Sequence, residues 1–282
     1  MRTVLLLMNP DKPRAHEVKV RLERRLAQAG FRTICAHTGK DVSGHELADE
    51  DLSAAELAFV LGGDGTLLGA ARQLAAHGVP LLGMNIGHLG FLSEAEPTTM
   101  EETVRRVVHK EYDLESRLML EATVWRNGEQ IAQLIGLNDV GIAKGSFARM
   151  VTVDAYVDNV FVDTYSGDGV IVSTPTGSTA YSLSCGGPIV IPHLQVILLT
   201  PICPHTLFSR PCVIDDEQVV RLVVHATHDD LGLTVDGQVG VRLLADDVVV
   251  VRKSSVQTIL VKWRDREFFA VLRQKLHGPG PL

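Results

Sequence analysis

The stretch Ala58–Arg72, with the sequence AFVLGGDGTLLGAAR, decides how the first part of the chain folds. A short apolar run, Phe59–Leu61, stops at the turn GGDGT (residues 62–66), and an Ala/Leu-rich segment of helical character begins at Leu67. This order is typical of a buried strand, a tight turn and a helix start. The glycines allow positive φ and close approach of a ligand to the backbone, and the helix N-terminus favours a phosphate.

Asp64 places a carboxylate in the middle of this turn, where an anion would otherwise be expected to bind. A carboxylate here is suited to act as a base toward a hydroxyl. It is equally suited to anchor the Mg²⁺ of a nucleotide. A third interpretation is that Asp64 only shapes the turn. The turn taken alone leaves all three open.

The composition indicates a globular protein with ample core. Of 282 residues, 45% are apolar and 22% are charged, and the net charge is −7, which argues against a nucleic-acid-binding protein or one bound to an anionic membrane. The four cysteines are widely spaced, as free thiols of a reducing cytosol would be, and do not predict a zinc site. The apolar run Val4–Met8 is too short for a signal peptide, and no run approaches membrane-spanning length. We therefore expect a cytoplasmic protein without a membrane contact.

The first 111 residues predict an α/β domain with a parallel, Rossmann-like sheet. Strands and helices alternate at the spacing of right-handed βαβ units. The expected strands are Thr3–Met8, Phe31–Ala36, Leu57–Leu61 and Val79–Met84, and the expected helices are Arg14–Ala29, Leu67–His77 and Pro97–His109. Ligands collect at the carboxyl ends of the strands of such a sheet, where Asp64 and Asn85 would both lie. Asn85 offers an amide to a ligand, or closes its strand with an Asx-turn.

From Tyr112 onward the pattern changes to short β-rich runs separated by Asn-Gly and Asp-Asn turns. We expect residues 112–262 to form a second, predominantly β, sandwich-like domain. Helical character returns at Arg266–Leu276. Residues 263–282 are therefore predicted to form a terminal helix, which packs back on the α/β domain, and a frayed tail.

A second glycine-rich stretch, Gly167–Pro188, lies inside the β-rich half. Its hydroxyls and backbone N–H groups at Thr176–Ser178 predict an anion-binding nest, and the ring of Tyr181 could stack on a base or a nicotinamide. Asp168 repeats the Gly-Asp-Gly pattern of the first turn. Two such turns could be purely structural, but together they favour a ligand site.

From Leu5 to about Phe269 the chain resembles the bacterial NAD kinase (ATP-NAD kinase) family. The resemblance rests on four stretches that occur in the family's order and approximate spacing: Gly62–Thr66, Asn85–Leu92, Asn138-Asp139 and Gly167–Pro188. The GGDGT turn alone is shared with diacylglycerol kinases, sphingosine kinases and phosphofructokinases. The run Ser173–Tyr181 is much more specific to the family.

This resemblance implies phosphorylation of the adenosine ribose 2′-hydroxyl of NAD by Mg-ATP, giving NADP and ADP. Asp64 would activate the hydroxyl, and Asp168 would reach a neighbouring subunit's pocket in a homodimer or homotetramer. The NAD-binding residues carried over from the family are Asp64, Gly65, Phe91, Asn138, Asp139, Asp168, Thr179, Ala180, Tyr181, Ser184 and Asp236. The phosphate- and ATP-binding residues would be Gly62, Gly63, Gly65, Thr66 and Asn85. No protein metal site is assigned: Mg²⁺ would arrive with ATP and touch at most Asp64, and polyphosphate is an alternative donor.

Two departures from the family pattern matter. Asp139 stands where the family has glutamate, and Gly69 stands where many members carry a basic residue. The positive charge for the triphosphate would then come from Arg72, Lys144 or Arg149, although each also fits a solvated surface position. Two other functions remain as alternatives: a lipid or sugar kinase with the same turn, and a non-catalytic NAD-binding regulator.

Overall fold

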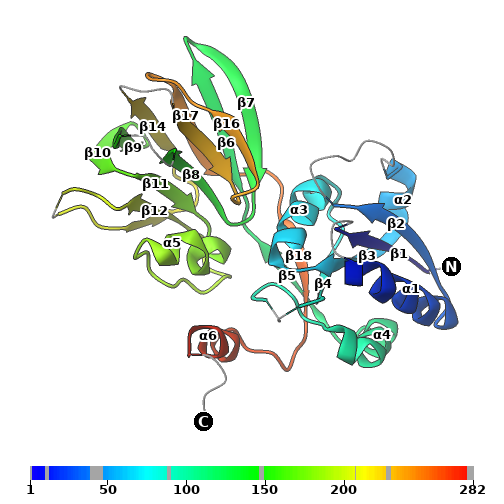
Figure 1. Cartoon of the computed structure of the whole chain (residues 1–282). Coiled ribbons are helices and arrows are strands. Elements are labelled where there is room, and N and C mark those ends of the chain that lie inside the picture. Colours follow the sequence, from blue (N-terminus) through cyan, green and yellow to red (C-terminus); the bar gives the residue numbers. More distant parts are fainter. Residues whose placement is uncertain are drawn as a thin grey trace. The chain divides into compact units, whose positions relative to one another are not determined.

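The computed structural model describes residues 2–9, 13–38, 47–87, 90–145, 149–206, 208–226 and 230–277. The chain forms two compact units, each with its own core (Figure 1). Unit 1 consists of Met1–Ser116 and Thr258–Leu282, and unit 2 of Arg117–Gln257. In the part of the chain that the structure describes, no helix is both long and apolar enough to cross a membrane.

The sheet of unit 1 has the strand order β2-β1-β3-β4-β18-β5. Its pairs β1–β2, β1–β3, β3–β4 and β4–β18 are parallel. The strands are β1 (Arg2–Met8), β2 (Phe31–His37), β3 (Ala55–Gly62), β4 (Leu81–Asn85), β5 (Asp113–Arg117) and β18 (Thr258–Lys262). The middle strands are buried on both faces, as their near-continuous apolar sequences require.

Helices cover both faces of this sheet (Figure 1). The helices of unit 1 are α1 (Pro13–Gln28), α2 (Asp49–Ala54), α3 (Asp64–Leu74), α4 (Met100–His109) and α6 (Phe268–His277), with 3₁₀ turns at Ala75–His77 and Pro97–Thr99. Residues of α1 and α4 share one core cluster with alternate residues of β3, including Phe59 and Leu61. Leu67 of α3 lies against Gly83, which alternates with the cluster residues Leu82 and Met84. The alternation places α3 on the opposite face from α1 and α4.

Unit 2 is a sandwich of two antiparallel sheets, each with six strands in the described part of the chain. Their orders are β10-β9-β14-β17-β6-β7 and β13-β12-β11-β8-β15-β16. The first sheet comprises β6 (Leu120–Arg126), β7 (Glu129–Gly136), β9 (Val151–Val157), β10 (Val160–Gly167), β14 (Val220–His225) and β17 (Val248–Lys253). The second comprises β8 (Asp139–Lys144), β11 (Gly169–Ser173), β12 (Val196–Ile202), β13 (Cys212–Asp215), β15 (Leu231–Val235) and β16 (Val239–Arg242). One core cluster contains apolar residues of both sheets, so it fills the space between them.

These two architectures confirm the predicted fold class of an α/β domain followed by a β-sandwich domain. Two strands are distributed differently from the sequence prediction. β5 and β18 fall within the predicted range 112–262, yet both belong to the sheet of unit 1. No helix was predicted between the second and third strands, where the structure has α2, which begins at Asp49. The predicted frayed tail, residues 278–282, lies outside the described residues. His88 and Leu89, within the family stretch Asn85–Leu92, also lie outside them.

Candidate functional site

The turn Gly62–Thr66 joins β3 to α3 directly. β3 ends at Gly62, Gly63 is the N-cap, and Asp64 is already the first residue of the helix. Gly62 is paired with Asn85 across β3 and β4, so both strands end at the same edge of the parallel sheet. The structure therefore brings Asp64 and Asn85 to the carboxyl edge of the sheet, as predicted from the motif positions.

None of the glycines at 62, 63 and 65 has a positive φ, and Gly62 is needed for close packing. Gly63 has a φ of −104°, and Gly62 and Gly65 are not among the positive-φ glycines either, so the expectation of positive φ was wrong. A Cβ on Gly62 would lie 2.2 Å from Oγ1 of Thr66. Thr66, only 8% exposed, therefore packs over the end of β3 where a side chain would collide.

Asp64 is oriented by the segment Gly90–Ala95, which we call the Asp64 loop. The backbone N–H of Phe91 donates to its Oδ2 at 2.8 Å. The backbone N–H of Leu92 and the hydroxyl of Ser93 donate to its Oδ1, each at 3.3 Å. An ionised carboxylate has about four acceptor sites. Among the described residues, three donors occupy these sites, which leaves one acceptor position on Oδ2.

The other predicted residues of unit 1 differ in how open they are. Gly65 is exposed and the side chain of Phe91 is half-buried. Asn85 is only 5% exposed, and its Oδ1 accepts the backbone N–H of Gly87 at 2.9 Å. This bond is the Asx-turn that the sequence left as the structural alternative. Asn85 thus closes β4 in the structure, and its role toward a phosphate stays a prediction.

In unit 2 the carboxylate of Asp236 holds the residues that lead into β8. Its Oδ1 accepts the backbone N–H groups of Asn138 at 2.7 Å and Asp139 at 3.3 Å. Its Oδ2 accepts the N–H of Leu137 at 3.2 Å. Asp236 itself has a φ of 52° in the turn after β15, a conformation that aspartate tolerates better than most residues. The turn thereby fixes the backbone of the Asn138-Asp139 pair.

The side chains of Asn138 and Asp139 are polar groups in buried surroundings. Oδ1 of Asn138 is buried and has no hydrogen-bond partner in the described part of the chain. Buried acceptors are normally satisfied, so this oxygen is a place for a ligand donor. Burial raises the pKa of the Asp139 carboxyl to about 7, and the nearby negative charge of Asp236 adds to the shift. Asp139 therefore changes its charge close to neutral pH.

The hydroxyl-rich run from Ser173 to Ser178 is folded inward and does not form the expected anion nest. Thr174 Oγ1 donates to the carbonyl of Leu137 at 2.6 Å and accepts the N–H of Gly177 at 3.0 Å. Ser178 is fully buried and bonds both backbone groups of Val190. These hydroxyls can be buried because each both donates to and accepts from backbone groups.

Gly177 allows this loop to lie directly on the Asn138 backbone. A Cβ at Gly177 would lie only 2.1 Å from the Asn138 carbonyl oxygen. The hydroxyl of Thr176 accepts a hydrogen bond from Nη1 of the buried Arg117 at 3.2 Å. Sequence reasoning missed Arg117, because nothing in its neighbourhood marks it as a partner of a loop 59 residues away.

The predicted NAD-binding residues beyond this loop are more accessible. Tyr181 begins the short helix α5 (Tyr181–Ser184) and is 49% exposed. Thr179 and Ala180 are half-buried and Ser184 is exposed. Asp168 precedes β11 and forms an ion pair with Lys144, Nζ to Oδ1 at 3.4 Å. Lys144, one of three candidates for triphosphate binding, is thus already paired with a predicted NAD-binding carboxylate.

The structure therefore groups the predicted residues in two sets, one in each unit. The set in unit 1 surrounds Asp64, and the set in unit 2 surrounds the Asn138-Asp139 pair and α5. The described residues contain no group of three or more His, Cys, Asp or Glu side chains that could hold a metal ion. Arg72 and Gly69 lie within α3, and Arg149 is exposed.

Comparison with known proteins gives a consistent result for both units. The family model of the ATP-NAD kinase N-terminal domain matches residues 4–112, and that of the C-terminal domain matches residues 137–263. The NAD kinase of Moorella thermoacetica is 43% identical over 99% of this chain and 91% of its own. The NAD kinase of Heliobacterium modesticaldum is 46% identical over 98% of this chain and 99% of its own.

Solved structures match over the same length. A crystal structure of yeast NADH kinase complexed with NADH has a TM-score of 0.86 at 24% identity, and covers 100% of this chain and 89% of its own. At that identity it supports the fold alone. An NAD kinase from Archaeoglobus fulgidus in complex with ATP has a TM-score of 0.78 at 25% identity. The match covers 99% of this chain and 100% of that chain. The class of protein to which this chain belongs is therefore the kinases. It belongs to the ATP-NAD kinase family.

Proposed function

We propose that this chain is an NAD kinase, which transfers the γ-phosphoryl group of ATP to the adenosine ribose 2′-hydroxyl of NAD and releases NADP and ADP. Support comes from relatives that are named NAD kinases and align over nearly the full chain. The observation that carries the chemistry is the carboxylate of Asp64, which is fixed by three donors with one acceptor position left on Oδ2.

In this proposal the 2′-hydroxyl donates to the remaining position on Oδ2 of Asp64. As the hydroxyl oxygen bonds the γ-phosphorus, Asp64 accepts its proton, and the bond from phosphorus to the β,γ-bridging oxygen breaks with its electron pair leaving on ADP. The N-terminus of α3 adds the positive end of the helix dipole beside the phosphates. The predicted phosphate-binding residues Gly62, Gly63, Gly65, Thr66 and Asn85 keep this role as part of the proposal.

We assign binding of NAD to the remaining predicted residues. Asn138 offers its buried Oδ1 to a ligand donor, and the exposed ring of Tyr181 is available for stacking. The proposal keeps Phe91, Asp139, Asp168, Thr179, Ala180, Ser184 and Asp236 in the same group. The bonds of Asp236 to the Asn138-Asp139 backbone suggest that it acts through this pair.

Mg²⁺ enters this scheme as part of the substrate Mg-ATP. The protein residue that this proposal allows to touch the ion is Asp64. The same proposal includes a cytoplasmic location and a homodimer or homotetramer, to which Asp168 would contribute across a subunit contact. Light scattering on the purified protein tests the oligomeric state.

The test of this function is an assay with Mg-ATP and NAD, coupled to an NADP-specific dehydrogenase. We expect NADP and ADP to form in equal amounts. If NAD raises the melting temperature but neither ATP nor polyphosphate yields NADP, the protein is a binding module and not a kinase. Phosphorylation of a lipid or sugar in a substrate panel, with no NADP formed, would identify one of the other kinase classes.

A further inference from the structure

The Asp64 loop has an unusually close fit to the carboxylate that it holds. A Cβ on Gly90 would lie 1.9 Å from Oδ1 of Asp64, so the loop backbone passes directly against the side chain. The next three residues supply the three donors described above. The orientation of Asp64 thus depends on where residues 90–93 are held, and a small displacement of this loop changes all three bonds.

A single arginine from the other end of the chain binds both ends of this short stretch. Nη2 of Arg266 donates to the carbonyl of Gly90 at 3.3 Å, and Nη1 donates to the carbonyl of Ser93. The Arg266 side chain is only 14% exposed. Because the guanidinium is planar and rigid, two bonds from it fix the spacing of the two carbonyls as well as their position.

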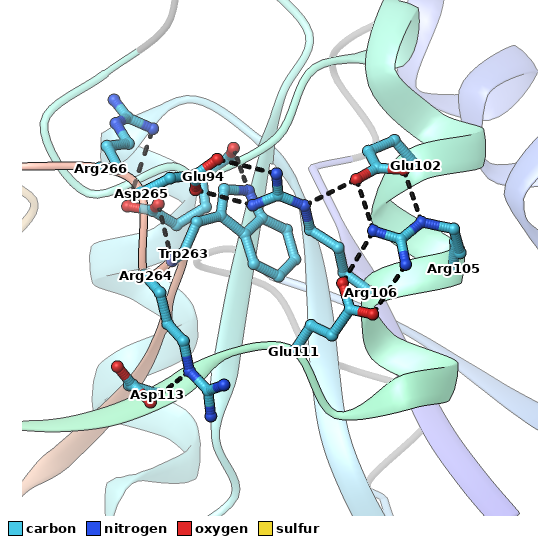
Figure 2. Close-up of polar contacts among 10 residues, drawn as sticks. All are labelled: Glu94, Glu102, Arg105, Arg106, Glu111, Asp113, Trp263, Arg264, Asp265 and Arg266. Atoms are coloured by element: carbon cyan, nitrogen blue, oxygen red, sulfur yellow. Dashed lines mark hydrogen bonds and ion pairs between the residues drawn. The ribbon is translucent and has the colours of Figure 1, made fainter.

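Glu94 anchors the same C-terminal segment from inside the protein (Figure 2). Its carboxylate, fully buried, forms an ion pair with Lys262 and accepts the backbone N–H of Trp263 at 3.2 Å. Its carbonyl accepts Nε1 of Trp263 at 2.7 Å, and Nη1 of Arg266 lies 3.7 Å from Oε1. A buried carboxylate is tolerated only with such partners, so Glu94 and the segment Lys262–Arg266 depend on each other.

The outer side of the segment is braced against α4. Asp265 accepts both Nη groups of Arg106 at 2.8 Å, and the Arg106 guanidinium lies 5.2 Å from the centre of the Trp263 ring. Arg106 also donates to Glu102 at 2.9 Å. Next to these contacts, Arg264 and Asp113 form an ion pair in which both side chains are more than 60% exposed. An ion pair this exposed contributes little to the free energy of unfolding. The segment thus offers a matched arginine that does not touch the loop.

We propose that Arg266 is a positioning residue for the proposed base. The segment Lys262–Arg266 packs against the Asp64 loop and holds the three donors of this loop against the Asp64 carboxylate. The inference rests on the proposed function, since it assigns Arg266 an effect on catalysis through Asp64. It extends that function to residues that follow the last strand of unit 1 and lie far from the glycine-rich motifs in sequence.

A merely structural role for Arg266 makes a different prediction from a positioning role. If the arginine only stabilised unit 1, its removal would lower kcat by the same factor whether or not Asp64 were present. If it acts through Asp64, the two substitutions are coupled, and removing Arg266 from a protein that already lacks the carboxylate has little further effect. A double-mutant cycle in kcat therefore separates the two.

The experiment compares Arg266→Ala, Arg266→Lys and the control Arg264→Ala, each with and without Asp64→Asn. We expect Arg266→Ala to lower kcat about 10- to 100-fold, the range for displacing a positioned group, with KM for NAD nearly unchanged. Arg266→Lys retains a donor for one carbonyl and should fall between this variant and the wild type, while Arg264→Ala should keep full activity. With Asp64→Asn present, Arg266→Ala should reduce kcat less than about threefold.

Hydrogen exchange provides a readout that does not depend on activity. The amides of Phe91 and Leu92 should exchange faster in Arg266→Ala and Arg266→Lys than in Arg264→Ala. Equal exchange in all variants, full kcat in Arg266→Ala, or the same fold-loss with and without Asp64→Asn would overturn the inference. If Asp64→Asn alone kept full activity, Asp64 would not be the base, and the proposed function and this inference would both fail. An inactive Asp64→Asn beside a fully active Arg266→Ala would reject the positioning role only.

Discussion

Asp64 in unit 1 and Asp236 in unit 2 are both carboxylates in glycine-containing turns, and both accept backbone N–H groups. The donors to Asp236 are the amides of three successive residues, 137–139, and the side chain is only 9% exposed. Asp64 is half-buried at the first position of a helix, and a hydroxyl supplies one of its donors.

Under the proposed function, the same chemical group holds a backbone at Asp236 and faces a substrate at Asp64. Each carboxylate accepts three hydrogen bonds from the described residues, two on Oδ1 and one on Oδ2. Asp236 is buried beside the start of β8, whereas Asp64 is half-buried at the carboxyl edge of a parallel sheet, where ligands bind in such folds. A Gly-Asp-Gly or Val-Asp-Gly pattern in a sequence therefore does not by itself distinguish a reacting carboxylate from a structural one.

The largest expected change in stability comes from Asp236→Asn. Asparagine keeps an oxygen for two of the N–H groups and tolerates the φ of 52°, but its amide N–H₂ would face the remaining donor. We expect the free energy of unfolding to fall by about 1–3 kcal/mol, the usual penalty for an unsatisfied buried group. Urea titration followed by circular dichroism measures it.

Asp158→Asn is a matched control for this change. Asp158 has a φ of 48° and accepts the N–H of Val219 at an exposed position. Its substitution should change the free energy of unfolding by no more than about 0.5 kcal/mol. Equal effects at the two positions would mean that Asp236 does not hold the entrance to β8.

The pH dependence of stability gives a second way to sharpen the comparison. The pKa of Asp139 is about 7 in the folded protein, against about 3.9 in an unfolded chain. Between these values the folded state holds the proton more tightly. The stabilisation from this group is therefore full below about pH 4 and is lost as the pH rises through about 7.

Asp139→Asn removes this titration. The melting temperature of the variant, relative to the wild type, should therefore improve steadily from pH 5 to pH 8. Asp113→Asn, at an exposed position, should show a constant difference over the same range. A difference for Asp139→Asn that does not change with pH would contradict the raised pKa.

The smallest effect is expected from Tyr181→Ala. Tyr181 is 49% exposed, and loss of a stacked ring is worth about 0.5–1.5 kcal/mol. KM for NAD should rise by up to about tenfold, with kcat within about twofold of the wild type. Tyr181→Phe retains the ring and should keep KM close to the wild-type value. Steady-state kinetics that show no change in KM for the alanine variant would argue against stacking.

Local patterns were sufficient to predict the α/β unit and the placement of Asp64 and Asn85. Buried parallel strands and amphipathic helices have strong periodic signals, and the strand-turn-helix order at Gly62–Thr66 fixes which edge of the sheet carries the site. The positive φ expected at Gly62 was wrong, because a sequence shows that a side chain is absent but not whether backbone angle or space requires its absence. The structure shows that space is the cause.

Long-range partners were beyond the reach of sequence patterns. β18 is separated from β4 by the whole of unit 2, yet the two strands pair in one sheet. Glu94 and Arg266 are likewise brought together only by folding. The hydroxyl-rich loop 173–178 illustrates a related problem. Its composition resembled an open anion site, whereas its buried hydroxyls bond backbone carbonyls of other segments, such as those of Leu137 and Val190.

The most direct test of the account is the rate of NADP formation by Asp64→Asn, with Asp113→Asn as the control that makes the same chemical change at an exposed site. We predict that Asp64→Asn lowers kcat by about 10²-fold or more, the usual contribution of a positioned base, while the variant remains folded by circular dichroism. Asp113→Asn should retain full activity. A folded Asp64→Asn variant that forms NADP at nearly the wild-type rate would contradict the role assigned to Asp64.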